Sequence, residues 1–419
     1  MLDKECRGRT ARNRGTIMNN FKKTLCLAAA ASVLAAAAPA LADDVKLGFL
    51  ADVTGPIAGF AGGMVSAGNL AVDQVNAQGG ILGGQKLVSI TADGACSADT
   101  AGPAADRLVN TEKVTAIFGD YCTGSTIAAA NTAAIPGNVV MISPSASAPT
   151  VTTVKDNDLL FRTVVSDAFQ GAKAAQLLLS QGVKEVGVTY VNNDYGKGLA
   201  DQFVKSFTEG GGKVAANVAH EDGKADYRPE IGQIEATGVQ TLVIYGYENA
   251  GGGAILNQAV EAGSFKLFVG GDGMAGDALL KSRDAASLEG MILTQSSAAS
   301  GEVYDIYAKL ATDAGLVPDT TYGPQSYDAA FLLALAIEKN GTADREGVSK
   351  ALRDVANAPG EVIHPGEWQK AVELIKAGTD INYEGASGPI EFDEAGDVAG
   401  GIDYFVIEGG KIVNKGQIQ

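Results

Sequence analysis

Short apolar runs alternate with longer amphipathic stretches along this chain, and this alternation constrains the fold more than any other feature. The apolar runs predict buried strands at residues 45–50, 87–92, 115–119 and 139–143. The first helical stretch between them, residues 64–78, has one apolar face with three- and four-residue spacing, made by Ala67, Leu70, Ala71 and Val75. Strand and helix in alternation predict a parallel α/β sheet with helices on both faces.

A second series of the same kind starts near residue 161. It predicts strands at residues 185–191, 213–220, 241–245 and 266–270. Helices are expected between them at about 168–181, 198–209, 227–237 and 252–262. Two such series predict an α/β protein with two Rossmann-like lobes. After about residue 302 we expect further helices and then a β-rich end at 388–393, 404–407 and 411–413.

The N-terminus has the pattern of a cleaved signal peptide. A basic stretch at 18–23 precedes an alanine-rich apolar stretch at 24–38, and Ala40-Leu41-Ala42 forms an A-x-A cleavage motif. A transmembrane anchor is the alternative, but the apolar stretch is short and ends in the cleavage motif. We therefore predict export to the periplasm with cleavage after Ala42, and the Arg-rich residues 1–17 suggest that Met18 is the true start.

The charge of the chain excludes some classes of partner. The net charge is −17, and the leader 1–42 carries seven basic and two acidic residues, which leaves −22 on the exported chain. A charge of this sign opposes binding to nucleic acid and to anionic membranes. It suits a soluble exported protein.

Cys122 lies in the stretch FGDYCTGST (118–126), where it could be a nucleophile or a structural residue. Cleavage of the leader removes two of the four cysteines and leaves Cys96 and Cys122. Two cysteines in an exported protein predict one disulfide. Each follows a predicted strand, and neighbouring parallel strands would bring the two loops together. A cysteine held in a disulfide is not a nucleophile.

Three loops of the first series follow strands and are rich in small and hydroxyl residues: 54–60, 122–126 and 143–147. Ligands of open α/β sheets bind at the carboxyl ends of strands. Free backbone N–H groups and hydroxyls at such ends predict a cradle for a carboxylate or another small anion.

The corresponding loops of the second series are 193–196, 245–248 and 271–273, and they bring aromatic rings and acids. Among these acids, Asp272 follows an apolar strand between glycines and is the stronger candidate for a ligand contact, and Glu248 is the weaker. An anion cradle that faces acids and aromatic rings suits a zwitterion.

A hydrolase that uses Ser125 or Ser145 is the competing class. No G-x-S-x-G motif occurs, and the only histidines, His220 and His364, are expected to be structural. Two histidines are also too few for a His-rich metal site. The glycines 251–253 lack a following Lys-Ser/Thr, so they predict a tight turn and helix start and not a phosphate-binding loop. From these observations together, no cofactor and no metal are expected.

Several motifs together carry a family resemblance. The chain resembles the periplasmic binding proteins of branched-chain amino acid ABC transporters, of the leucine/isoleucine/valine-binding type. The matching stretches span nearly the whole exported chain in family order: DVTGPIAGFAGGMVSAGNLAVDQVNAQGGILG (52–83), ADGACSADTA (92–101), GDYCTGST (119–126), MISPSASAPT (141–150), FRTVVSDAFQG (161–171), NDYGKGLA (193–200), GGDG (270–273), LEGMI (288–292) and GPIEFDEAGDVAG (388–400).

The resemblance implies a type I periplasmic binding protein fold, in which three hinge crossovers join the lobes, here near residues 161–163, 291–293 and 403–406. The first lobe would be 43–161 plus 293–402, and the second 163–291 plus 406–419. The resemblance also implies the Cys96–Cys122 disulfide. It places the ligand carboxylate on Thr123, Ser145 and Ser147, the ammonium on Asp272, and aromatic walls at Phe60 and Tyr195. It further implies an inner-membrane ABC permease as partner, with a monomer as the default state.

Two acids depart from the family pattern. Relatives often have an aromatic residue where Glu248 falls here, with Tyr247 beside it, and often a histidine where Asp120 precedes the cradle. We therefore include Tyr247 and Glu248 among the candidate ligand contacts, with the hypothesis that the ligand side chain is polar or cationic. Aliphatic amino acids, amides, urea and aromatic acids stay open as ligands, as does a periplasmic sensor role.

Overall fold

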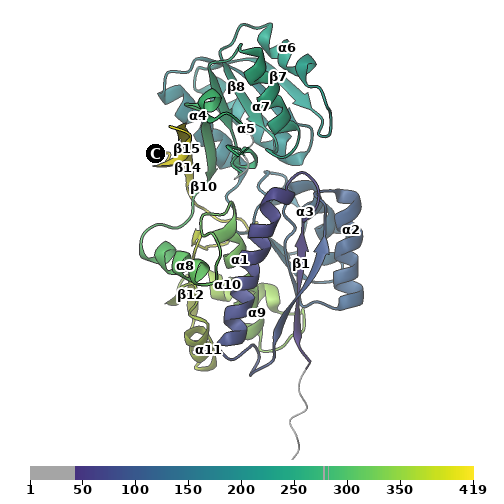
Figure 1. The fold of residues 1–419 in the computed structure, drawn as a ribbon. Helices are drawn as coiled ribbons and strands as arrows, with labels where there is room; N and C mark the ends of the chain where they lie inside the picture. The colour runs from purple at the N-terminus through teal and green to yellow at the C-terminus, as the bar shows by residue number, and fades with distance from the viewer. Residues whose placement is uncertain (1–42, 277–278, 282) are drawn as a thin grey trace, which may run out of the picture. The chain divides into compact units, whose positions relative to one another are not determined.

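The computed structural model describes residues 43–276, 279–281 and 283–419. Within these ranges three sheets form, and the two larger ones are each covered by helices (Figure 1). The signal-peptide and start-site predictions, with Cys6 and Cys26, fall on residues 1–42 and lie outside the described residues. No helix in the described ranges has both the length and the apolar character that a membrane crossing requires.

The first sheet contains five parallel strands, as the first series predicts. In spatial order they are β2 (Leu87–Asp93), β1 (Val45–Ala51), β3 (Ala116–Phe118), β4 (Val140–Ser143) and β5 (Leu160–Arg162). Alternate residues of β1 face opposite cores: Phe49 packs with one cluster of buried side chains and Leu50 with another. The strands β1, β3, β4 and β5 are therefore buried on both faces, which explains their continuous apolar runs, whereas the edge strand β2 is only partly buried.

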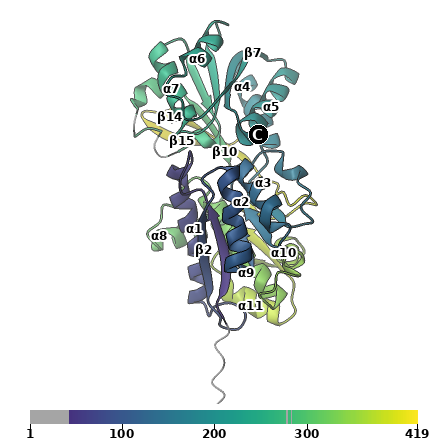
Figure 2. The same ribbon diagram turned by 90° about the vertical axis from the view of Figure 1, so that its right-hand side faces the viewer.

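Helices from distant parts of the chain cover the two faces of this sheet. One face carries α1 (Ala58–Ala77) and α9 (Gly323–Asn340), which lie side by side although they are far apart in the sequence (Figure 1). The other carries α2 (Ala98–Asp106) and α3 (Thr123–Ala129), each continued by a π-helical segment, Arg107–Glu112 and Ala130–Ala134 (Figure 2). Almost every side chain of α9 is buried, because neighbours pack around it on all sides.

The second sheet has seven strands. In spatial order they are β15 (Lys411–Gln417), β14 (Ile402–Glu408), β10 (Ile292–Ser296), β9 (Leu267–Gly270), β8 (Thr241–Tyr245), β6 (Glu185–Val191) and β7 (Lys213–His220). The pairs from β7 to β10 are parallel, whereas β14 and β15 join antiparallel at the β10 edge. The helices α4 (Asp167–Ser180) and α5 (Asp194–Glu209) pack on one face, and α6 (Arg228–Glu235) and α7 (Gly251–Ala262) on the other.

These two sheets confirm the prediction of two α/β lobes. The lobe boundaries stay a proposal, which sheet membership refines: β10 remains in the second sheet as far as Ser296, and β14 enters it at Ile402. We therefore propose that the second crossing follows Ser296 and that the third precedes Ile402.

The segment between β10 and β14 holds α8 (Glu302–Asp313), α9, α10 (Val348–Ala356) and α11 (Trp368–Lys376). It also holds the third sheet, with β11 (Glu361–Ile363), β12 (Ile381–Gly385) and β13 (Gly388–Pro389). The expected strand at 388–393 is wrong beyond Pro389. Beyond Pro389 the backbone pairs with a side chain instead of a strand: the N–H of Phe392 donates to Asn357 Oδ1 at 3.0 Å, and the carbonyl of Phe392 accepts from Asn357 Nδ2 at 2.7 Å.

The start of α1 also differs from the sequence expectation. Residues 54–60 were expected to form a loop, yet the helix begins at Ala58. The glycines that suggested a loop serve close packing: a Cβ on Gly59 would lie 2.2 Å from the side chain of Asn249, and one on Gly63 would lie 2.1 Å from Thr320.

Candidate ligand site between the two sheets

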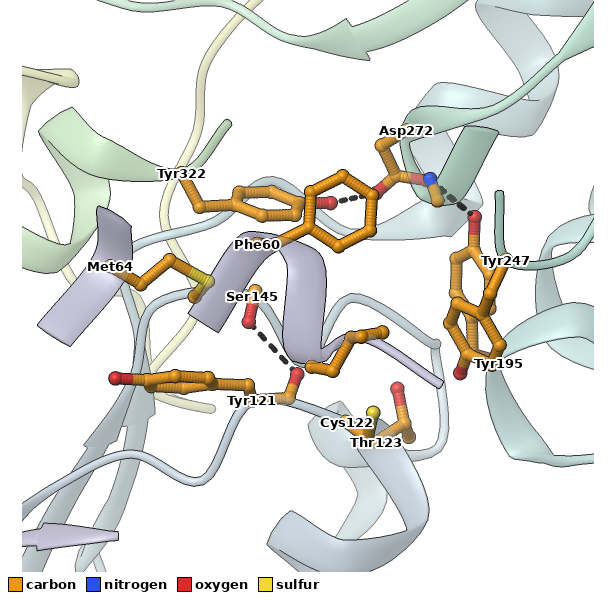
Figure 3. A pocket seen from close by; sticks show the side chains of 12 residues that line it. Phe60, Met64, Tyr121, Cys122, Thr123, Ser145, Tyr195, Tyr247, Asp272 and Tyr322 are labelled. Carbon is orange, nitrogen blue, oxygen red and sulfur yellow. Dashed lines mark hydrogen bonds between the residues drawn. The ribbon is translucent and has the colours of Figure 1, made fainter. Parts of the chain in front are cut away.

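A pocket lies between the carboxyl ends of the two sheets, at the position that the sequence predicts (Figure 3). It encloses about 40 Å³, which is room for roughly three water molecules. A ligand of amino-acid size would therefore need the walls to move apart. Among the described residues its lining is Ile57, Phe60, Met64, Tyr121, Cys122, Thr123, Ser145, Tyr195, Tyr247, Asp272, Gly273 and Tyr322.

The disulfide holds the first-sheet side of the pocket. Cys96 and Cys122 are bonded, which confirms the predicted pairing and excludes Cys122 as a nucleophile. The carboxylate of Asp52, at the end of β1, accepts hydrogen bonds from the backbone N–H groups of Cys96 (2.5 Å) and Cys122 (3.0 Å). This arrangement ties the two half-cystine loops to the central strand.

The hydroxyl residues of the cradle lie beside the disulfide. Thr123 begins α3 and is buried, and its Oγ1 accepts a hydrogen bond from the backbone N–H of Ala148 at 3.4 Å. The hydroxyl of Ser145 donates to the carbonyl of Tyr121 at 2.9 Å (Figure 3). These contacts join the loop after β3 to the loop after β4, so both present polar groups to the same pocket.

Asp272 supplies the acid on the second-sheet side. It follows β9, is buried, and accepts hydrogen bonds from the hydroxyl of Tyr195 (2.6 Å) and the backbone N–H of Gly273 (3.0 Å). The hydroxyl of Tyr322 donates to its other oxygen (Figure 3). Burial raises the pKa of the Asp272 carboxyl, and the Tyr195 hydrogen bond opposes that rise.

Two stacked tyrosines form an aromatic wall next to Asp272. The rings of Tyr195 and Tyr247 lie 5.3 Å apart with an angle of 22° between their planes. The side-chain amide of Asn193 donates to the Tyr247 hydroxyl at 3.2 Å and fixes that ring. Burial raises the pKa of the Tyr195 hydroxyl well above its usual range, so this group stays a neutral donor.

Six of the sequence-predicted ligand residues line the pocket: Phe60, Thr123, Ser145, Tyr195, Tyr247 and Asp272. Ser147 lies behind the wall, where its hydroxyl donates to the buried carboxyl of Asp167 at 3.0 Å. Glu248 is likewise buried outside the lining, in an ion pair of 2.7 Å with Arg283. Contact of any of these residues with a ligand stays a prediction.

The two acids behind the hypothesis of a polar or cationic ligand side chain are both absent from the lining of the pocket. Arg283 neutralises Glu248. Asp120 is fully buried, and its burial and the adjacent Asp52 carboxyl raise the pKa of Asp120 well above its usual range. Neither acid offers a free negative charge to a ligand side chain.

Four lining residues escaped the sequence analysis: Ile57, Met64, Tyr121 and Tyr322. Ile57 and Met64 belong to the start of α1, where apolar residues are as readily explained by packing. Tyr121 lies in the stretch 118–126, but the sequence analysis considered Asp120, Cys122 and Thr123 on either side of it. Tyr322 is about fifty positions from Asp272 in sequence and reaches the pocket only because α9 starts there.

In the part of the chain that the structure describes, the serine residues considered for hydrolysis donate their hydroxyls to backbone carbonyls and not to a histidine. The hydroxyl of Ser125 donates to the carbonyl of Cys122 at 3.0 Å. His220 lies at the end of β7, where its Nδ1 is paired with the hydroxyl of Thr189 at 2.9 Å. Burial lowers the pKa of His220 to about 4, and its ring stays neutral.

Comparisons with known proteins agree with this geometry. Residues 44–396 match the family described as periplasmic binding protein. The chain is 30% identical to the leucine-, isoleucine-, valine-, threonine-, and alanine-binding protein of Pseudomonas aeruginosa, over 90% of this chain and 93% of that one. It is 32% identical to a Leu/Ile/Val-binding protein of Rhizobium johnstonii, over 80% and 90%. A leucine binding protein of Thermotoga maritima superposes with a TM-score of 0.75 at 25% identity, over 90% and 99%.

Proposed function

Since this chain belongs to the periplasmic binding protein family, we propose that it captures an amino acid with an apolar side chain between its two lobes. The resemblance found in the sequence motifs and the type I fold that it implies are confirmed. The chain is a solute-binding protein of an ABC transport system and not an enzyme.

One observation carries the ligand proposal: the hydroxyl loops of one lobe face a buried carboxyl of the other across a single pocket. Thr123 can donate to a carboxylate, Ser145 can do so if its hydroxyl turns from the Tyr121 carbonyl, and Asp272 can accept from an ammonium. An ammonium next to Asp272 would offset the cost of burying that carboxylate. The two groups together suit a zwitterion better than either charge alone.

The rest of the lining supports an apolar side chain. Ile57, Phe60 and Met64, from the start of α1, present carbon and sulfur atoms to the pocket. Because Arg283 pairs with Glu248 and Asp120 is buried beside Asp52, we withdraw the hypothesis of a cationic side chain. The names of both relatives include leucine, isoleucine and valine, which agrees with this choice, and one of them also includes threonine and alanine.

A carboxylate without an ammonium is the second candidate. Asp272 already accepts hydrogen bonds from two tyrosine hydroxyls and one backbone N–H, so an ammonium is not needed to satisfy it. In that case Tyr195 and Tyr322 would continue to donate hydrogen bonds to Asp272 while the cradle binds the carboxylate of the ligand.

Binding would be coupled to closure of the lobes. A ligand that contacts both lobes binds the closed arrangement better, and it shifts the population towards that arrangement by hinge motion. We propose that an inner-membrane ABC permease then receives the closed form. We further propose a monomer that is exported to the periplasm with cleavage after Ala42; a periplasmic sensor would use the same closure with a different partner.

A thermal-shift screen tests the proposal. The purified protein is unfolded and refolded to remove any carried ligand and is then melted with each amino acid and with matched carboxylates. A ligand that binds only the native state raises the melting temperature. We expect a rise with leucine, isoleucine or valine and none with lysine or arginine. A rise with deaminated carboxylates alone would favour the second candidate, and no rise with either series would contradict both.

A further inference from the structure

Arg162 is a fully buried arginine at the end of β5, and the pocket described above does not include it. Arginine is almost never fully buried unless its charge is paired. Its place in the chain is also unusual, because β5 is the last strand of the first sheet before the chain enters the second lobe. Its guanidinium group contacts two segments of the first lobe, the loop after β4 and the turn before β14.

One side of the guanidinium group holds the loop after β4. Its Nη1 donates to the carbonyls of Ala146 (3.3 Å), Ser147 (2.8 Å) and Ala148 (3.1 Å). Hydrogen bonds from a charged donor are stronger than those between neutral groups. Because the three carbonyls are consecutive, one charged group fixes the backbone of the whole loop.

The other side of the guanidinium group pairs with Asp397. Nε and Nη2 of Arg162 donate to the two carboxylate oxygens at 2.7 and 2.6 Å, a bidentate geometry that arginine provides and lysine does not. Nη2 also donates to the hydroxyl of Thr152 at 2.8 Å. The backbone N–H of Asp397 in turn donates to the carboxylate of Asp393 at 3.0 Å. Every nitrogen of the guanidinium group therefore has an acceptor.

The loop that Arg162 holds is the one that brings the cradle to the pocket. Ser145, which lines the pocket, directly precedes the three carbonyls. The N–H of Ala148, on the same loop, donates to Oγ1 of Thr123, the other hydroxyl residue of the cradle, at 3.4 Å. Arg162 thus acts on both cradle residues through the backbone and not by touching the pocket itself.

We propose that Arg162 is a positioning residue for the ligand carboxylate and that Asp397 holds its guanidinium group in place. Groups that bind a ligand must be held within about 0.5 Å of their productive geometry by the residues behind them. Without the bidentate guanidinium group the loop can shift, and the contact with the carboxylate weakens. This inference rests on the proposed function, and specifically on a carboxylate at Thr123 and Ser145.

The experiment compares two ligands that differ only at the carboxylate. Leucine and leucinamide share the side chain, and at about pH 6 both amines are protonated. Titration calorimetry of the refolded protein with each ligand gives the preference for leucine, which is the ratio of the two dissociation constants. Arg162→Lys keeps the charge but loses the bidentate geometry, so it should lower this preference roughly tenfold, the equivalent of one charge-assisted hydrogen bond.

Arg345 offers a matched control in the same lobe. It also donates to three backbone carbonyls, those of Val109, Val114 and Gly137. These carbonyls precede β3 and β4, at the opposite edge of the sheet from the ligand pocket. Arg345→Lys should therefore lower the free energy of unfolding in denaturant titrations and leave the preference for leucine unchanged.

The outcomes separate this inference from the proposed function. Asp397→Asn serves if Arg162→Lys fails to fold, and it should lower the preference in the same direction. A folded Arg162→Lys or Asp397→Asn with the wild-type preference, whatever its stability, would overturn the positioning role alone. If wild type binds only deaminated carboxylates, the preference is measured with 4-methylpentanoate and its amide, and the amino-acid proposal fails by itself. A wild type that prefers neither acid over its amide would contradict the carboxylate cradle and this inference together.

Discussion

Replacing Asp272 by asparagine removes the charge of the proposed ammonium site, and the new amide nitrogen would donate to the Tyr322 hydroxyl where Asp272 now accepts from it. The two side chains have the same shape, and an amide oxygen can still accept the hydrogen bond that Tyr195 donates at 2.6 Å. Because Asp272 is buried, truncating its half of a charged pair should cost about 2–5 kcal/mol of binding free energy. That range corresponds to a roughly 30- to 5,000-fold weaker dissociation constant.

The assay pairs this variant with a ligand that lacks the ammonium. Titration calorimetry with leucine and with 4-methylpentanoate, its deaminated analogue, gives four dissociation constants for wild type and Asp272→Asn. We expect the variant to lose affinity for leucine and to bind 4-methylpentanoate about as wild type does. Asp201→Asn is the control, because Asp201 is an exposed acid on α5 that pairs with Lys197. This variant should change the affinity for neither ligand. Equal losses for both ligands would refute the contact between Asp272 and the ammonium.

Three further predictions follow from the charges of the described residues. Burial raises the pKa of Asp272, so on acidification the affinity for amino acids should begin to fall at a higher pH than an exposed aspartate would give, and Asp272→Asn should abolish that dependence in titrations at stepped pH. Arg283→Met leaves Glu248 buried without its partner and should cost about 3–5 kcal/mol of unfolding free energy in denaturant titrations, which Glu248→Gln should largely restore. His220 has a folded pKa of about 4, against 6.5 when exposed, so the unfolded chain binds the extra proton more tightly. Stability is therefore full above pH 6.5 and should fall by about 3 kcal/mol towards pH 4, a loss that His220→Gln should reduce; an unchanged pH profile would contradict the assignment.

Most of the fold was predictable because its central strands, such as β1, β4 and β8, are buried on both faces. Continuous apolar runs such as 185–191 and 241–245 coincide with β6 and β8, and glycines mark many helix ends. Prediction failed where tertiary contacts override local composition. Gly59 and Gly63 suggested a loop, although they allow α1 to pass close to Asn249 and Thr320. The backbone after Pro389 has strand-like composition, yet at Phe392 it pairs with the side chain of Asn357 and not with another strand.

The site was predictable to the extent that it lies in loops after strands. The loops that hold Thr123, Ser145 and Asp272 were identified in this way, because parallel sheets place such loops at one edge. The family resemblance then singled out Thr123 and Ser145 within their loops. The charge state of the buried acids could not be predicted, because it depends on partners that are distant in sequence. Glu248 pairs with Arg283, and Asp120 lies beside the carboxyl of Asp52. Tyr322 was missed for the same reason, since only the packing of α9 brings it to Asp272.

The most direct test of the account is a crystal structure of the refolded protein with bound leucine. The account predicts the ligand carboxylate at Thr123 and Ser145, its ammonium within hydrogen-bonding distance of Asp272, and its side chain against Phe60 and Met64. A ligand bound elsewhere, or one whose ammonium points away from Asp272, would contradict it.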